Sequence, residues 1–170
     1  MTSKLLIKNI LRGPLTERAP APDATALAEE LSRAARARLG RSLSIREVDA
    51  GSCNGCELEI HAINNVVYDP ERFGLRFVAS PRHADVLLVT GPVTLNMRQA
   101  LERTYQATPG PKWVVAVGDC ARNGGIFAGS QACVGGVSAV LPVDLHIPGC
   151  PPSPEALLKG LLALVESVSR

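Results

Sequence analysis

Short apolar stretches alternate with amphipathic segments along most of the chain. From Ser42 onward the apolar stretches are rich in Val, Ile and Leu, which predicts β-strands. Between them, apolar residues recur at helical spacing, which predicts helices. The predicted strands cover residues 42–50, 75–78, 85–90, 113–117 and a short stretch near Leu145, and the predicted helices cover 57–68, 96–106 and 154–168.

This alternation of strands and helices favours an α/β fold. Strands that are apolar throughout suit a parallel sheet with both faces covered. We therefore predict a flavodoxin-like three-layer sandwich over residues 42–170 with a mostly parallel sheet. In such sheets ligands bind beyond the carboxyl ends of the strands.

Residues 1–41 form a predicted N-terminal helical arm. Residues 4–12 place aliphatic side chains on one helical face and Lys4, Lys8 and Arg12 on the other. A proline-containing linker follows, and a second helix is predicted from Asp23 to Leu39. Residues 4–12 fit three roles: a helix on a membrane surface, docking on an integral membrane subunit, or packing on the core of the domain itself.

Composition excludes several function classes. The chain has 170 residues, 46% of them apolar, and a net charge of +2, which is too small for electrostatic nucleic-acid binding. Residues 1–48 carry a net charge of +4 and residues 49–170 carry −2. No Gly-x-Gly-x-x-Gly turn or phosphate-binding loop is present, so nucleotide binding is not expected. Without an apolar export signal or membrane span, the cytoplasm is the expected compartment.

The cysteines offer the main candidate chemistry. In a reducing compartment they are better interpreted as metal ligands or reactive thiols than as disulfides. Cys53 and Cys56 follow the first predicted strand, Cys120 follows the strand 113–117, and Cys150 follows the strand near Leu145. Because parallel strands end at the same edge of a sheet, these thiols are expected to converge.

Four thiolates can hold either a tetrahedral zinc ion or an iron–sulfur cluster. Zinc sites usually pair two Cys-x-x-Cys turns, whereas this chain joins one such turn to two single cysteines from distant loops. That pattern favours a cluster, with zinc and unrelated buried thiols as alternatives.

The residues around these cysteines resemble a known family. The motifs are Cys53-Asn-Gly-Cys56-Glu-Leu-Glu59, Gly118-Asp-Cys120-Ala-Arg-Asn-Gly-Gly125 and Ile147-Pro-Gly-Cys150-Pro-Pro-Ser-Pro-Glu155. Together they resemble the cluster-bearing small subunit shared by respiratory complex I and the nickel–iron hydrogenases, and most of all the group 4 membrane-bound and formate hydrogenlyase types. Complex I subunits of this family carry two adjacent cysteines at the first motif, where this chain has Cys-x-x-Cys.

The resemblance implies one [4Fe-4S] cluster on Cys53, Cys56, Cys120 and Cys150. It also implies a large subunit that bears the nickel–iron site, a ferredoxin-like iron–sulfur subunit as electron partner, and a peripheral position on the cytoplasmic face of the inner membrane. A complex I type subunit that passes electrons to quinone is the alternative within this family. A structural zinc-binding interaction module is the alternative outside it.

Five further residues lie in or near these motifs. The family has an acidic group near its cluster at the position of Glu59, which is either a group that couples proton movement to the cluster or an ordinary first-turn carboxylate. Glu57 is interpreted as such a carboxylate. Cys133 matches no ligand of the family and is interpreted as a small apolar residue. His61 and His146 are expected to have structural roles.

Overall fold

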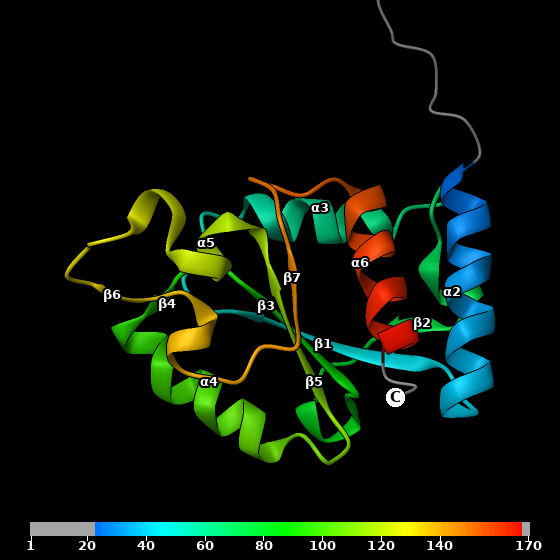
Figure 1. Cartoon of the computed structure of the whole chain (residues 1–170), viewed down its shortest axis with the longest axis horizontal. Coiled ribbons are helices and arrows are strands. Elements are labelled where there is room, and N and C mark those ends of the chain that lie inside the picture. Colours follow the sequence, from blue (N-terminus) through cyan, green and yellow to red (C-terminus); the bar gives the residue numbers. More distant parts are fainter. Residues whose placement is uncertain (1–22, 168–170) are drawn as a thin grey trace, which may run out of the picture.

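A five-stranded parallel sheet forms the centre of the protein (Figure 1). The computed structural model describes residues 23–167. The strand order is β2-β1-β3-β5-β7, and all neighbouring pairs are parallel. The strands are β1 (Leu43–Asp49), β2 (Leu75–Phe77), β3 (Val86–Thr90), β5 (Trp113–Val117) and β7 (Leu145–Ile147).

This order is that of a flavodoxin-like, doubly wound sheet. The second strand in sequence lies outside the first, and the later strands extend the sheet in the other direction. The order therefore reverses between β1 and β3, where ligands bind in folds of this class. The predicted α/β class is confirmed.

Helices cover both faces of the sheet. One face packs against α2 (Asp23–Leu39), α3 (Gly55–Ile63) and α6 (Pro154–Ser167), and the other against α4 (Leu95–Ala107) and α5 (Gly118–Asn123). Alternate residues of β3 point to opposite faces of the sheet. Val86 and Leu88 pack in the first core, on the α2, α3 and α6 side, and Leu87 and Val89 pack in the second core, on the α4 and α5 side. Short 3-10 turns span Pro70–Phe73, Pro81–His83, Gly125–Phe127 and Val137–Ala139.

Helix α2, which the sequence pattern assigns to the N-terminal arm, packs on the sheet domain. It lies beside α6 at one end of the molecule (Figure 1). Leu31 and Ala35 are fully buried and belong to the same core as β1 and α6. The predicted docking segment, residues 4–12, lies outside the described residues.

Helix α3 ends at Ile63, earlier than the predicted Tyr68. The backbone N–H groups of Val67 and Tyr68 donate to the Asn65 side-chain oxygen at 2.8 and 3.1 Å. Asparagine competes in this way for backbone donors that a helix would otherwise use. The result is a turn that leaves Val66 96% exposed.

Three small elements, β4, β6 and α5, lie in regions where the pattern predicts no secondary structure. Strands β4 (Val93–Thr94) and β6 (Cys133–Gly135) form a separate antiparallel pair beside α4 and α5 (Figure 1). Helix α5 occupies the start of the predicted glycine-rich loop. No helix between residues 23 and 167 is long and apolar enough to cross a membrane.

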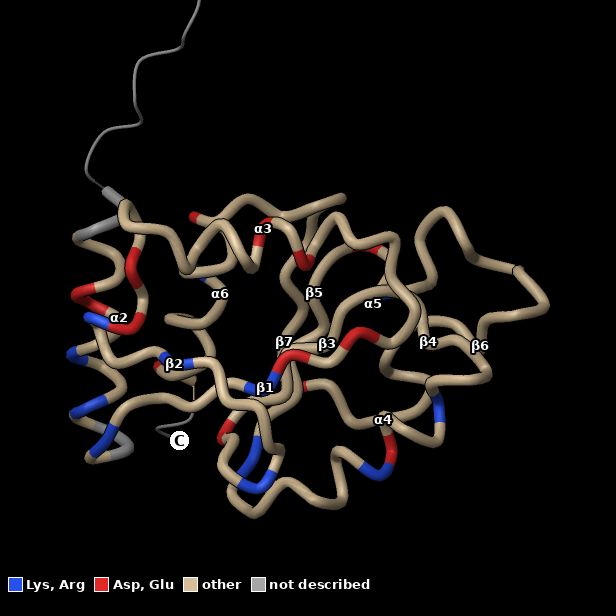
Figure 2. The backbone as a smooth tube through the Cα atoms, turned by 180° about the vertical axis from the view of Figure 1, so that it is seen from behind, with Lys and Arg blue, Asp and Glu red and all other residues tan. Residues whose placement is uncertain are grey.

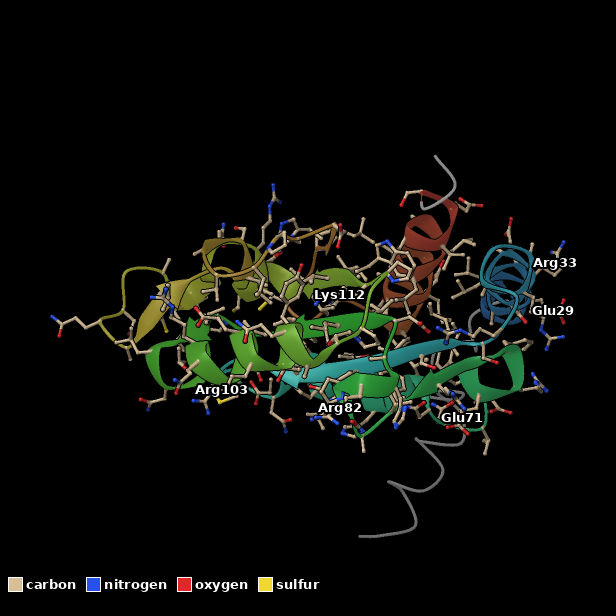
Figure 3. All side chains as sticks on the ribbon, turned by 90° about the horizontal axis from the view of Figure 1, so that it is seen from below. Glu29, Arg33, Glu71, Arg82, Arg103 and Lys112 are labelled. Atoms are coloured by element: carbon tan, nitrogen blue, oxygen red, sulfur yellow. The ribbon has the colours of Figure 1, made fainter. Side chains whose placement is uncertain are left out.

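Charged residues are spread unevenly over this framework. Helix α2 carries both acidic and basic residues, Arg side chains lie on the neighbouring strands β1 and β2, and the helix α3 carries acidic residues (Figure 2). On α2, Glu29 and Arg33 point away from the sheet into solvent (Figure 3).

Candidate metal centre

Four cysteines line one cavity at the carboxyl edge of the sheet. Cys53 and Cys56 come from the loop after β1 and the first turn of α3, Cys120 from α5, and Cys150 from the loop after β7. The cavity has a volume of about 100 Å³, several times the roughly 30 Å³ that one water molecule occupies. Gly91, which follows β3, also lines it, so the cavity lies at the point where the strand order reverses.

Side-chain hydrogen bonds shape the loop that carries Cys53. The Asp49 Oδ1 atom accepts hydrogen bonds from the backbone N–H groups of Gly51 and Ser52, both at 2.7 Å. Ser52 Oγ then accepts one from the N–H of Asn54 at 3.0 Å. Asn54 takes a left-handed conformation with φ 70° directly before α3. The chain thus turns sharply between the two cysteines.

Glycines leave room for the sulfur atoms. A Cβ atom on Gly118 would lie 2.7 Å from Cys56 Sγ, and one on Gly125 would lie 2.7 Å from Cys120 Sγ. Both glycines also have positive φ angles, 85° and 50°, which other residues rarely adopt. The backbone at Gly118 and Gly125 therefore approaches the sulfur atoms of Cys56 and Cys120 more closely than a residue with a side chain would allow.

Burial differs among the four cysteines. Cys120 is buried and Cys56 is partly buried, whereas Cys53 and Cys150 are exposed. Burial raises the pKa of Cys56 to about 12, with further contributions from Glu57 and the other three cysteines. Burial also raises the pKa of Cys120, and a hydrogen bond from the Ile126 backbone partly offsets this. Without a metal these two thiols stay protonated at neutral pH, so metal binding must displace protons.

The donor set suits an iron–sulfur cluster. Sulfur is the ligand that such clusters use, and here four thiols line one cavity together with three glycines, Gly55, Gly91 and Gly149. Among the described residues, no group of three or more His, Cys, Asp and Glu side chains is arranged to hold a metal ion. The four thiols instead line the wall of a space larger than one ion, and a cluster would be held by Cys53, Cys56, Cys120 and Cys150.

The two acidic residues of α3 differ in burial, and the more buried one is Glu57, for which the sequence analysis expected only an ordinary first-turn carboxylate. Glu57 is 7% exposed and both of its carboxylate oxygens are buried without a hydrogen-bond partner, whereas Glu59 is only partly buried. The spacing of Glu57, Ile60 and Ile63 along one helical face would have indicated this burial.

Glu47 on β1 is a second acidic residue that sequence reasoning missed. Its Oε1 atom is buried without a hydrogen-bond partner. Burial raises its pKa, and the nearby Glu57 and Asp49 raise it further. Glu47 and His61 line a separate pocket of about 240 Å³ on the β2 side of α3.

The other candidates from the sequence analysis, Cys133, His61 and His146, do not line the cavity. Cys133 is on β6, where it pairs with Thr94, and it does not line the cavity. His61 and His146 are exposed. Asp119 does line the cavity, and sequence reasoning gave it no role.

Fold and site together define a doubly wound α/β protein with four thiols gathered at the switch point of its sheet. Residues 53–164, which contain all four cysteines, match the family described as NADH ubiquinone oxidoreductase, 20 Kd subunit. The chain belongs to this family.

Curated relatives of the chain are named as subunits of oxidoreductase complexes. The probable membrane-bound hydrogenase subunit mbhJ of Pyrococcus furiosus is 46% identical over 78% of this chain and 79% of its own length. Formate hydrogenlyase subunit 7 of Escherichia coli is 48% identical over 72% of this chain, but the match covers only 48% of that protein. A subunit of the NADH-quinone oxidoreductase of Citrifermentans bemidjiense is 46% identical over 67% of this chain and 66% of its own length.

Solved structures agree with this assignment. A chain in the structure of the membrane-bound sulfane sulfur reductase, an archaeal respiratory membrane complex, has a TM-score of 0.67 and 37% identity. That match covers 82% of this chain and 76% of the other. A chain of an NAD+-reducing [NiFe]-hydrogenase has a TM-score of 0.59 at 21% identity, covers 75% of this chain and 93% of its own length, and shows the shared fold. The protein is thus an oxidoreductase subunit of the hydrogenase and complex I type.

Proposed function

We propose that this protein carries one [4Fe-4S] cluster on Cys53, Cys56, Cys120 and Cys150 and relays electrons in a membrane-associated oxidoreductase of hydrogenase type. One observation carries the proposal: thiols from three different strand ends line a single cavity. When bound, the cluster accepts and donates single electrons, and the protein sets its position and potential.

The exposure of the ligands supports an electron path across a subunit interface. Cys53 and Cys150 lie at the surface, so one side of the cavity would face a partner. Two large apolar side chains lie close in sequence to ligands at this edge: Leu58 is 60% exposed and Ile126 is 80% exposed. Exposed apolar residues around a site favour a protein partner there. We assign this surface to the large subunit, which would bear the nickel–iron centre.

Further partners complete the proposed complex. Electrons would pass between the cluster and a ferredoxin-like iron–sulfur subunit on one side and the large-subunit active site on the other. Residues 4–12 would dock on an integral membrane subunit, which would place the protein on the cytoplasmic face of the inner membrane. Glu59, near Cys56 on α3, would couple proton movement to the charge of the cluster.

A complex I type role is the second candidate, because a subunit of NADH-quinone oxidoreductase is among the relatives. In that role the cluster would pass electrons to quinone at the large-subunit interface. The Cys-Asn-Gly-Cys spacing at Cys53 favours the hydrogenase type, since complex I subunits carry adjacent cysteines there. Hydrogen evolution by the purified complex, measured beside quinone reduction, distinguishes the two roles.

Replacing one ligand tests the cluster itself. Anaerobically purified protein is expected to contain iron and sulfide and to give an EPR signal on reduction. Cys150→Ala should abolish that signal, whereas Cys133→Ala should keep it, because Cys133 does not line the cavity. A colourless protein with one zinc ion would contradict electron transfer and favour a structural zinc module. An intact signal in Cys150→Ala would remove Cys150 from the ligands.

A further inference from the structure

Asp119 connects the loops that carry two different cysteines. It directly precedes Cys120, and its backbone N–H donates to the carbonyl oxygen of Gly149 at 2.9 Å. In return the N–H of Gly149 donates to Asp119 Oδ1 at 3.1 Å. Gly149 directly precedes Cys150. The two bonds therefore fix the backbone just before one cysteine against the backbone just before the other, although 30 residues separate them.

The backbone around this pair has little freedom to shift. Gly149 has a φ of 137°, and a Cβ atom there would lie 2.5 Å from the Cα of Pro152. On the other side of the pair, a Cβ atom on Gly118 would lie 3.3 Å from the Gly149 carbonyl oxygen as well as 2.7 Å from Cys56 Sγ. The backbone on both sides of the Asp119–Gly149 pair is therefore closely packed, against Cys56 Sγ at Gly118 and against Pro152 at Gly149.

The charge of Asp119 lies next to the thiols. Asp119 lines the cavity shared by the four cysteines and also an open pocket of about 390 Å³ beside Cys120 and Cys150. A negative charge beside a bound redox group disfavours an additional electron on that group, because the two negative charges repel each other.

We propose that Asp119 is a positioning residue that latches the Cys120 loop to the Cys150 loop and lowers the reduction potential of the cluster held between them. This inference rests on the proposed function, because it requires a redox-active group on these cysteines. The hydrogen bond to Asp119 Oδ1 holds the two loops together, and the negative charge of the carboxylate lowers the potential. The two roles can therefore be removed one at a time.

The chain contains a matched control for this latch. At the opposite ends of the same two strands, the N–H of Asp144 donates to the Val114 carbonyl oxygen at 2.9 Å. The N–H of Val114 donates to Asp144 Oδ2 at 2.7 Å, again across 30 residues. Asp144 thus joins the starts of β5 and β7 as Asp119 joins the loops after them, but it lines neither cavity beside the cysteines.

The experiment compares Asp119→Asn, Asp119→Ala, Asp144→Asn and Asp144→Ala with the wild type in the full-length protein within its complex. Iron and sulfide content, the rate of iron loss to a chelator, and the midpoint potential from an EPR-monitored redox titration are measured. Asp119→Asn keeps an acceptor oxygen and should retain the cluster, while its reduction equilibrium shifts about tenfold toward the reduced form, or ~59 mV for one electron. Asp119→Ala should lose iron about tenfold faster, as expected when a partner of the ligand loops is removed. The Asp144 variants should keep the wild-type potential.

Several outcomes would overturn the inference. An unchanged potential in Asp119→Asn would remove the role of the charge, and wild-type iron retention in Asp119→Ala would remove the latch. An equal shift of potential in Asp144→Asn would assign the effect to general loosening of β5 and β7. A wild-type protein without iron and sulfide would overturn the proposed function itself, and this is seen before any variant is compared.

Discussion

At the scale of single residues, the cavity depends as much on missing side chains as on the thiols. Gly118 and Gly125 leave the space that Cys56 Sγ and Cys120 Sγ occupy. Asp49, Ser52 and Asp119 then hold the surrounding loops through hydrogen bonds to backbone N–H groups. A side chain added at one of these glycines would act on the sulfur atoms directly, before it affected the rest of the fold.

Replacing Gly118 with alanine should prevent cluster binding. The new Cβ would lie 2.7 Å from Cys56 Sγ, and alanine at a φ of 85° costs roughly 1–2 kcal/mol in backbone strain. Gly129 has nearly the same φ, 82°, with no atom within 4 Å of a Cβ. Gly129→Ala should therefore have similar backbone strain but retain iron. Iron content and thermal unfolding of both variants provide the measurement, and equal iron content would contradict this account of Gly118.

Alkylation tests the protonation of Cys56 in the metal-free protein. Its pKa of about 12 is above the ordinary thiol value, so almost none of it is thiolate at pH 8. Unfolding in urea restores the ordinary pKa, and the rate with iodoacetamide should rise by roughly two to three orders of magnitude. Mass spectrometry of the peptide that contains Cys56 follows the reaction. Equal rates in native buffer and in urea would show that burial does not raise this pKa.

At the scale of elements, the strength of the local pattern decided what could be predicted. The buried strands β1, β3 and β5 are rich in Val, Ile and Leu, and the helices α4 and α6 are long and amphipathic. Their predicted ranges therefore agree closely with those in the structure. The pair β4–β6 could not be found in this way, because its strands have two and three residues and pair across a long loop. Helix α5 has six residues, too few for a periodic signal.

Substitutions in α2 test its place in the core. Leu31 of α2 is fully buried in the first core. Leu31→Ala should therefore lower the free energy of unfolding by roughly 2–5 kcal/mol. Arg33 on the same helix points into solvent (Figure 3), and Arg33→Ala should change the free energy of unfolding by less than about 0.5 kcal/mol. Urea denaturation measures both. A harmless Leu31→Ala would mean that α2 does not share the core of the sheet domain.

At the scale of the whole molecule, topology explains why the site could be predicted and where the prediction ends. Parallel strands end at one edge, so placing cysteines after three strands was enough to predict their convergence, and the cavity brings them together. The burial of Glu57 and the Asp119–Gly149 pair depend on side-chain directions and on loop contacts across 30 residues, which no local pattern records.

The dispersal of the four thiols along the chain also constrains biosynthesis. Cys53 leaves the ribosome 97 residues before Cys150, and the cavity needs β7 paired beside β5 before its last thiol is in place. An iron–sulfur cluster delivered to a nascent chain that ends before Cys120 would meet only the Cys-Asn-Gly-Cys turn. Insertion of the proposed cluster would therefore wait until the sheet is nearly complete, and it would act on a folded acceptor protein rather than guide the early steps of folding.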